Sequence, residues 1–186
     1  MKIGLSGNIG SFSEEATDYY CQKENIKDYQ KEYLISAEKA LASVEDGTVD
    51  LGIFPIENSN GGIVYEAVYA MAKHLFEIQK MFEIDIRHNL IVKPGTKKED
   101  IKVIASHPQA LKQCRMYIKQ HWPDAELKEW SDTASAVKAV KESELPEGSA
   151  AIASSKAAEI HKMEILEDGI QDLKFNFTTF LAITKK

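Results

Sequence analysis

Short apolar runs alternate with helical patterns along most of this chain, and this alternation constrains the fold more than any other feature. Strand-like runs occur near the amino terminus and twice more in the first third, and a helical pattern follows each of them. The predicted strands are 2–5, 32–35 and 50–54, and the predicted helices are 12–24, 37–46 and 63–76. Repeated βα units predict an α/β fold with an open, mostly parallel sheet.

A second set of βα units follows a long strand-like segment, 77–92, that has no helical pattern. The predicted strands of this set are 102–105, 126–130, 150–153 and 164–166, with helices at 107–121, 133–144 and from 155, and a closing strand lies within 175–184. Two similar sets predict two lobes with a cleft between them. The expected boundaries assign 1–77 and 171–186 to the first lobe and 78–170 to the second.

Composition excludes several classes of protein. The 186 residues are 44% hydrophobic and 28% charged, with a net charge of −6, as in an ordinary soluble globular protein. No basic stripe is present, which argues against a nucleic-acid partner. The chain has no apolar stretch long enough to span a membrane, and its amino terminus reads as a strand rather than a signal peptide. Cys21 and Cys114 have no disulfide or metal spacing, so a cytoplasmic location is expected.

Hydroxyl and amide side chains gather where the predicted helices begin. Ser11, Ser106 and Thr133 each lie at such a start, and both Ser11 and Ser106 have a Glu or Gln three residues later, the spacing of a capping box. Helix starts offer free backbone N–H groups, so several facing one cleft would bind carboxylates without lysine. Each residue taken alone is better explained as a helix cap than as a ligand.

The segment from Phe54 to Gly62 places a carboxylate, an amide and a hydroxyl in a row at a predicted strand-to-helix corner. These are Glu57, Asn58 and Ser59. Polar groups collected on a loop beside a sheet are typical of a binding site. This segment therefore predicts a site without saying which one.

Two further segments are open to alternative interpretations. Gln109 and Gln113 share one face of a helix, and Gln113 is either a ligand or part of a solvated face. Near the carboxyl terminus, strand alternation would place Asn176, Thr178 and Phe180 on one side and Thr179 on the other, in a site or in an ordinary strand.

The chain lacks the patterns of the common cofactor sites. Its five histidines have no metal-ligand spacing, and no nucleophile elbow is present. The glycines at 4, 7 and 10 have the wrong spacing for a dinucleotide or phosphate loop. We therefore expect neither a metal nor a nucleotide cofactor.

Together, four blocks of this sequence resemble the catalytic domain of the prephenate dehydratase family. They are Gly7–Ala16, Pro55–Ser59, Ser106–Cys114, and Ile170-Gln-Asp with Asn176-x-Thr178-x-Phe180. The resemblance implies a two-lobed fold like that of type II periplasmic binding proteins. It also implies cofactor-free conversion of prephenate to phenylpyruvate in phenylalanine biosynthesis, by a cytoplasmic homodimer or homotetramer.

The resemblance also implies roles for particular residues. Thr178 is the expected donor to the leaving hydroxyl, and Glu57 is a competing acid if burial raises its pKa. Asn58 and Gln113 complete the expected catalytic set. The expected substrate-binding residues are Ser11, Ser59, Ser106, His107, Gln109, Thr133, Asn176 and Thr179.

Two departures from the family pattern keep alternatives open. Thr179 stands where the family usually has an arginine, which can bind a carboxylate bidentately. No chorismate mutase segment and no phenylalanine-sensing ACT domain is expected, and hence no feedback by phenylalanine. The alternatives are an arogenate dehydratase, a prephenate decarboxylase that does not aromatise the ring, and a non-catalytic binder of a small aromatic or dicarboxylate ligand.

Overall fold

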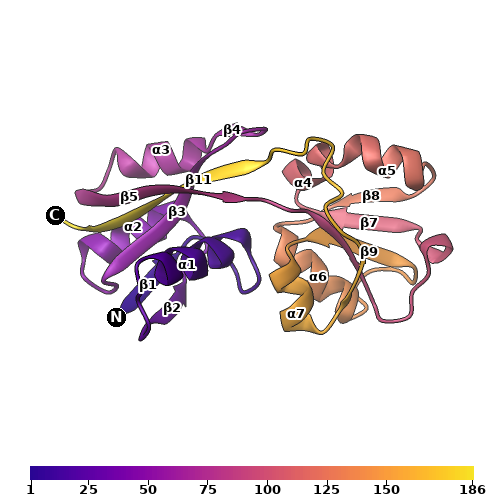
Figure 1. The fold of residues 1–186 in the computed structure, drawn as a ribbon, viewed down its shortest axis with the longest axis horizontal. Helices are drawn as coiled ribbons and strands as arrows, with labels where there is room; N and C mark the ends of the chain where they lie inside the picture. Colours follow the sequence, from indigo (N-terminus) through magenta and orange to yellow (C-terminus); the bar gives the residue numbers. More distant parts are fainter. The chain divides into compact units, whose positions relative to one another are not determined.

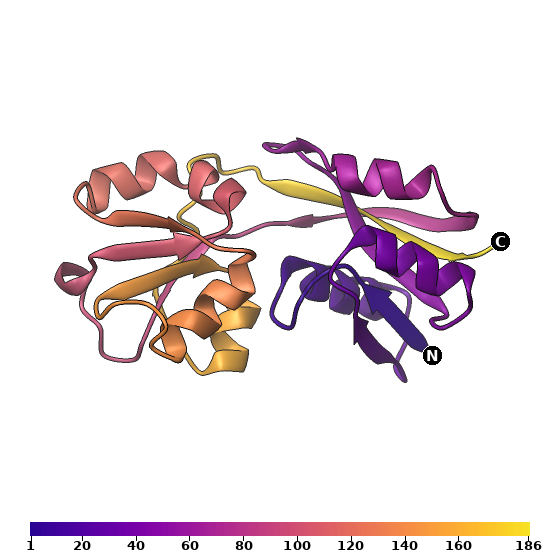
Figure 2. The ribbon, with the colours of Figure 1, turned by 180° about the vertical axis from the view of Figure 1, so that it is seen from behind.

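A computed structural model describes residues 1–186, and the chain divides into two compact units (Figures 1 and 2). Unit 1 comprises Met1–Ile86 and Phe175–Lys186, and unit 2 comprises Arg87–Lys174. These boundaries differ from the expected ones at 77 and 171. The first boundary lies later because strand β5, Phe76–Asp85, pairs along its whole length within the sheet of unit 1. The second lies later because Ile170 and Asp172 bond to His88 and Gln113 of unit 2.

Unit 1 contains a sheet in the order β2-β1-β3-β11-β5, with the short β4 paired to β3. Strands β1, β2, β3 and β5 run in one direction, whereas β11 lies between β3 and β5 and runs in the opposite direction. The elements of unit 1 are β1 (Lys2–Leu5), α1 (Phe12–Lys23), β2 (Gln30–Tyr33), α2 (Ala37–Glu45), β3 (Leu51–Asn58), β4 (Gly62–Ile63), α3 (Tyr65–Met71), β5 and β11 (Phe177–Lys185).

Apolar side chains cover both faces of this sheet. Helix α1 packs on one face around Tyr20, Phe82 and Phe180, and helices α2 and α3 pack on the other around Leu41 and Phe54. Burial of each such large apolar side chain contributes roughly 1.5–3 kcal/mol. The two faces are therefore distinct environments, and a strand residue's face determines its neighbours.

Unit 2 contains a sheet in the order β10-β6-β9-β7-β8, in which only β6 runs against the others. Helices α4 and α5 cover one face and α6 and α7 the other (Figure 1). The elements are β6 (Asn89–Val92), the 3₁₀ turn η1 (Lys98–Asp100), β7 (Val103–Ser106), α4 (Pro108–Gln113), α5 (Arg115–His121), β8 (Glu126–Glu129), α6 (Thr133–Lys141), β9 (Ser149–Ala153), α7 (Ser155–His161) and β10 (Glu164–Glu167).

The predicted α/β class with mostly parallel sheets is confirmed. Each sheet has one main strand of opposite direction, and it is the strand that the chain enters on arriving from the other unit: β6 after β5, and β11 after β10. Each unit therefore contributes its own helices but depends on a crossing segment to complete its sheet.

Two local predictions were wrong. The segment Glu57–Gly62 does not open a helix: β3 continues past Pro55 through a bulge and turns back as the β3–β4 hairpin. Proline is tolerated there because a bulge relieves the ladder. The single helix expected at 107–121 is two helices, which break at Cys114.

Candidate functional site

In unit 1, Asn58 and Thr178 lie side by side on neighbouring strands. They are directly paired residues of β3 and β11, and Asn58 Nδ2 donates to Thr178 Oγ1 over 2.8 Å. The turn residues Asn60 and Gly61 donate their backbone N–H groups to Asn58 Oδ1, at 3.0 and 2.7 Å. These two bonds fix the orientation of the Asn58 amide. Its N–H₂ end therefore faces the Thr178 hydroxyl.

Asn176 and Ser59 hold this pair in place. Asn176 is fully buried; its Oδ1 accepts from Asn58 Nδ2 at 2.9 Å and its Nδ2 donates to the Ile86 carbonyl at 3.2 Å. Ser59 Oγ accepts from the Phe177 backbone N–H at 3.0 Å. This arrangement favours a supporting role for Asn176 over the substrate contact that the sequence suggested.

Glu57 and Thr179 point to the opposite face of the sheet from Thr178. Paired residues of antiparallel strands share a face, and Thr179 pairs with Glu57 on one side and Glu83 on the other. Thr179 Oγ1 donates to Glu83 Oε1 at 3.3 Å. Because Glu57 is exposed, the burial that an acid role required is absent. The structure thus separates Glu57 and Thr179 from the Asn58–Thr178 pair.

Ser11 begins α1 as its N-cap and accepts from the Glu14 backbone N–H at 3.3 Å. The loop before it approaches closely: a Cβ on Gly7 would lie 2.4 Å from Ser11 Oγ, so a larger residue there would displace the capping hydroxyl. The loop ends on a buried carboxylate, since Glu14 Oε2 accepts from the Gly10 N–H at 2.7 Å. Ser11 therefore acts as a cap in a rigid loop.

Glu14 is a structural residue of this loop that the sequence marked only as part of a capping box. Its Oε1 accepts from Lys31 Nζ and from the Tyr33 hydroxyl, each at 2.9 Å. Burial raises the pKa of Glu14, but the bonds from Gly10, Lys31 and Tyr33 outweigh it and lower the pKa below the ordinary value. In the sequence, only the capping-box spacing to Ser11 singled out Glu14. Its partners Lys31 and Tyr33 on β2 could not be identified from the sequence.

In unit 2, the N-cap of helix α4 is His107 and not Ser106, which the sequence predicted. Ser106 is the last residue of β7, is fully buried and donates to the Ile152 carbonyl at 2.6 Å. The N-cap of α4 is His107, whose Nδ1 accepts from the Gln109 N–H at 3.3 Å. Thr133 is the first residue of α6, and the cap there is Asp132. These residues lie at the carboxyl edge of the strands, where ligands of α/β sheets gather.

Gln113 has a partner that the sequence did not suggest. Its Oε1 lies 2.7 Å from Nε2 of His88, a residue only 4% exposed. The Gln113 carbonyl also accepts from the Asp172 N–H at 2.8 Å. His88 is 25 positions away and carries no motif of its own, so no sequence pattern could have found it.

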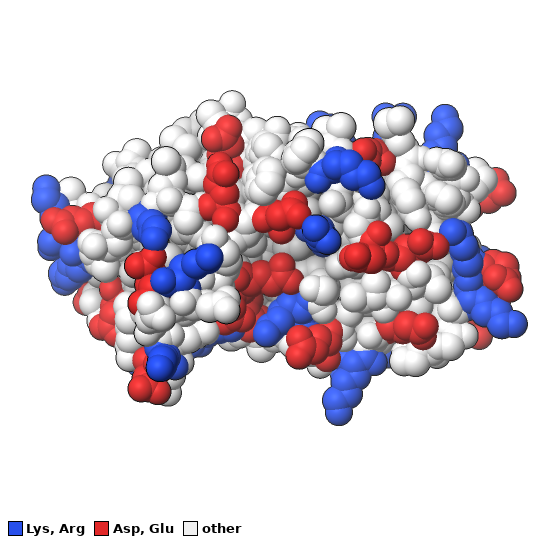
Figure 3. Space-filling model, viewed as in Figure 1, with Lys and Arg blue, Asp and Glu red and all other residues white.

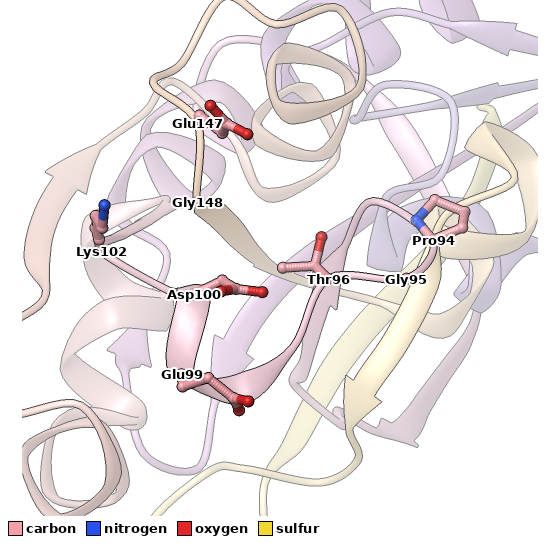
Figure 4. Close-up of a pocket in the computed structure, with 8 residues that line it drawn as sticks. All are labelled: Pro94, Gly95, Thr96, Glu99, Asp100, Lys102, Glu147 and Gly148. Atoms are coloured by element: carbon pink, nitrogen blue, oxygen red, sulfur yellow. The ribbon is translucent and has the colours of Figure 1, made fainter.

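A pocket of 420 Å³ in unit 2 does not contain any of the predicted residues (Figure 4). It is lined in part by Lys102 and Gly148, which directly precede β7 and β9, and by the carboxylates Glu99, Asp100 and Glu147. It therefore lies at the amino edge of these strands, whereas Ser106 ends β7. This position argues against the pocket as the site of the predicted chemistry.

Surface charge and metal-binding potential are unremarkable. On the face seen in Figure 3, lysine and arginine side chains are interspersed with aspartate and glutamate and form no broad basic surface.

No group of three or more histidine, cysteine, aspartate or glutamate side chains is arranged to hold a metal ion. None of the helices has the length and apolar character needed to cross a membrane.

The fold and the loops define a two-unit α/β protein of the kind also used by binding proteins. A putative methionine-binding lipoprotein from Bacillus subtilis superposes with a TM-score of 0.54 at 13% identity, covering 100% of this chain and 83% of that one. The expected binding-protein-like fold is thus confirmed. The model of the prephenate dehydratase family matches residues 3–186, and the chain belongs to that family.

Relatives and solved structures agree with this membership. Prephenate dehydratase from Methanocaldococcus jannaschii is 40% identical over 95% of this chain, and arogenate dehydratase/prephenate dehydratase 6 from Arabidopsis thaliana is 31% identical over all of it. A prephenate dehydratase structure from Arthrobacter aurescens, in complex with L-Phe, has a TM-score of 0.91 at 26% identity, covering 100% of this chain and 60% of that one. This chain spans 62% of the archaeal relative and 44% of the plant relative.

Proposed function

We propose that this chain catalyses the decarboxylating dehydration of prephenate to phenylpyruvate, a step of phenylalanine biosynthesis. The observation that carries the proposal is the bond from Asn58 Nδ2 to Thr178 Oγ1. An amide nitrogen can only donate, so the Thr178 oxygen is the acceptor and its own hydrogen points elsewhere. A hydroxyl fixed in this way is suited to donate to a leaving hydroxyl.

The chemistry asks little of the protein. The bond between the ring carbon and its carboxylate breaks to release carbon dioxide, and the electron pair moves into the ring. The bond to the ring hydroxyl breaks in turn, and hydroxide leaves as water once it has gained a proton. Because the ring becomes aromatic, holding the substrate and stabilising the leaving oxygen with the Thr178 O–H suffice.

Substrate binding must neutralise two carboxylates without an arginine at position 179. We propose that backbone N–H groups and side-chain donors do this, including the Gln113 amide. Ser11, Ser59, Ser106, His107, Gln109 and Thr133 remain candidate contacts in this proposal. Thr179 is not retained as a contact, because it lies on the opposite face of the sheet from Thr178. Glu57 is a weaker candidate for the acid than Thr178, because its side chain is exposed and belongs to the opposite face of the sheet.

The deciding experiment is to incubate the purified protein separately with prephenate and with arogenate at neutral pH and to identify the products. Phenylpyruvate formed faster than in a protein-free control would support the proposal, and phenylalanine formed only from arogenate would make the chain an arogenate dehydratase. A decarboxylated product that retains the ring hydroxyl would indicate a decarboxylase. Binding of either compound without turnover would indicate a binder.

We also propose a homodimer or homotetramer. Strand β5 lies at the edge of its sheet and pairs only with β11, and Leu75, Ile78 and Met81 expose 54–66% of their surface there. An open edge with exposed apolar side chains is normally covered by a partner. Light scattering after gel filtration tests this, and replacing Ile78 and Met81 with lysine should then yield monomers.

A cytoplasmic location is part of the same proposal. Cys21 and Cys114 are both buried free thiols. Free thiols of this kind fit a reducing compartment. Cell fractionation of the native host with an antibody to this chain tests the location.

A further inference from the structure

His88 is the most deeply buried histidine of the chain, and its side chain contacts that of Gln113. The His88 backbone is held by a segment far away in sequence: its N–H donates to Gln171 Oε1 at 3.1 Å and its carbonyl accepts from the Ile170 N–H at 2.8 Å. The imidazole is thereby fixed next to α4. Its Nε2 lies 2.7 Å from Gln113 Oε1.

Gln113 is anchored to the same segment. The backbone carbonyl of Gln113 accepts from the Asp172 backbone N–H. The Asp172 carboxylate in turn accepts from the backbone N–H groups of Met116 and Tyr117 at the start of α5, at 2.9 Å each. Asp172 therefore caps the start of α5, and the residues just before it, Ile170 and Gln171, hold the His88 backbone. The backbones of both His88 and Gln113 are hydrogen-bonded to residues 170–172, and these bonds hold the two side chains at contact distance.

A glutamine amide has one acceptor end and one donor end of nearly equal size, so its surroundings decide which end points where. Burial lowers the pKa of His88, which keeps the ring neutral near pH 7. A neutral imidazole carries its proton on only one nitrogen. A proton on Nε2 would fix Gln113 Oε1 as the acceptor.

We propose that His88 is a positioning residue, whose Nε2–H holds Gln113 Oε1 so that the Gln113 N–H₂ is the end offered to the anionic substrate. The inference rests on the proposed function, in which Gln113 contacts the substrate. A flipped amide would turn a carbonyl oxygen toward a carboxylate and repel it. His88 thus acts through Gln113 and does not touch the reacting atoms.

The tautomer can be measured without any catalysis. Ring ¹⁵N chemical shifts of the wild-type protein at pH 7, assigned to His88 by comparison with His88→Gln, should report a neutral ring protonated at Nε2. A ring protonated at Nδ1 alone, or a charged ring, would overturn the proposal. This result does not depend on whether the chain turns over prephenate.

Kinetics then test the effect on the reaction with two variants of equal length. His88→Gln can place a donor close to the position of Nε2, whereas His88→Met cannot. We expect KM to rise roughly 10- to 100-fold in His88→Met, because a flipped Gln113 amide repels the substrate carboxylate, with kcat changed less than about threefold. His88→Gln should keep KM close to the wild-type value, and thermal melting shows whether both variants fold.

A double-mutant cycle separates positioning from a general structural role. In a Gln113→Ala background, His88→Met should raise KM by less than about twofold, because the contact it removes is already gone. Full additivity, or equal rises of KM in His88→Gln and His88→Met, would contradict the proposal. If the wild type turns over neither prephenate nor arogenate, the proposed function fails, and the tautomer still decides whether His88 fixes the Gln113 amide.

Discussion

The side-chain amide of Asn58 donates to the hydroxyl of Thr178 over 2.8 Å, between residues that are 120 positions apart. Two backbone N–H groups of the turn after β3 fix the amide, and the register of β3 and β11 brings the hydroxyl to it. The hydroxyl oxygen is an acceptor in this contact, so its proton is available to a ligand. The direction of the Thr178 O–H therefore depends on the chemical identity of residue 58.

Replacing Thr178 should affect turnover and leave the fold intact. Thr178→Val keeps the size and shape of the side chain but removes the hydroxyl, and we expect kcat to fall about 100- to 1,000-fold, the usual range for loss of a transition-state donor. Thr178→Ser keeps the hydroxyl and should retain at least about a tenth of the activity. Near-normal turnover by the folded valine variant would refute the assignment of Thr178 as the donor.

Asn58→Asp tests the direction of the same hydrogen bond with almost no change in shape. A carboxylate accepts only, so the Thr178 hydroxyl would donate to residue 58 and lose its proton for the substrate. We expect kcat to fall at least about tenfold at neutral pH, although Thr178 itself is unchanged. Circular dichroism and melting serve as the folding control. Unchanged kcat would mean that this contact does not orient the hydroxyl.

Thr179→Arg should stabilise the sheet rather than tighten substrate binding. Residue 179 faces Glu57 and Glu83 across neighbouring strands, away from the side of Thr178. A guanidinium there would pair with these carboxylates and raise the free energy of unfolding by about 0.5–1 kcal/mol. Thr179→Met, long but uncharged, is the matched control. A lower KM with no gain in stability would show that the arginine reaches the substrate instead.

Glu14 should matter most near neutral pH. Its pKa is lower in the folded chain than the ordinary 4.5, so its contribution to stability is present above about pH 4.5 and is lost as pH falls through the folded value. Glu14→Gln removes the charged acceptor of Gly10 and Tyr33 and leaves Lys31 paired with Asp18 alone, so it should cost about 1–3 kcal/mol at pH 7. Urea denaturation at pH 7 and pH 3.5 measures this. A difference that does not shrink in acid would contradict the linkage, and Glu66→Gln on exposed α3 is the control.

His74 should stabilise unit 1 in the opposite pH direction. Its Nδ1 lies 2.6 Å from Glu45 and its Nε2 lies 3.0 Å from Glu38, and these carboxylates raise the pKa of His74 above 6.5. A raised pKa stabilises the fold fully below about pH 6.5, and the contribution is lost as pH rises through the folded value.

The charged groups around His74 affect the pH range over which it stabilises the fold. Lys73 pairs with Glu38, and Lys185 lies near Glu45; the pKa values of both glutamates are lowered, mainly by His74. The advantage of wild type over His74→Gln, measured as the free energy of unfolding in urea, should therefore be larger at pH 6 than at pH 9. An equal difference at both pH values would exclude a charged His74.

The sequence by itself determined the architecture of this protein. Apolar periodicity located nearly every strand and helix, because a buried face must repeat every two residues in a strand and every three to four in a helix. Strand alternation also correctly separated Asn176, Thr178 and Phe180 from Phe177, which is 38% exposed. The motif blocks identified the family, and the family model confirms it over residues 3–186.

Tertiary structure alone decided how the polar side chains are paired. The bulge at Ile56 and the strand register place Asn58 beside Thr178, with Glu57 on the other face of the sheet. His88 reached Gln113, and Glu14 reached Lys31, through contacts between distant elements. Local propensity specifies where elements form, but hydrogen-bond partners far apart in sequence depend on the register and packing that only the folded chain establishes.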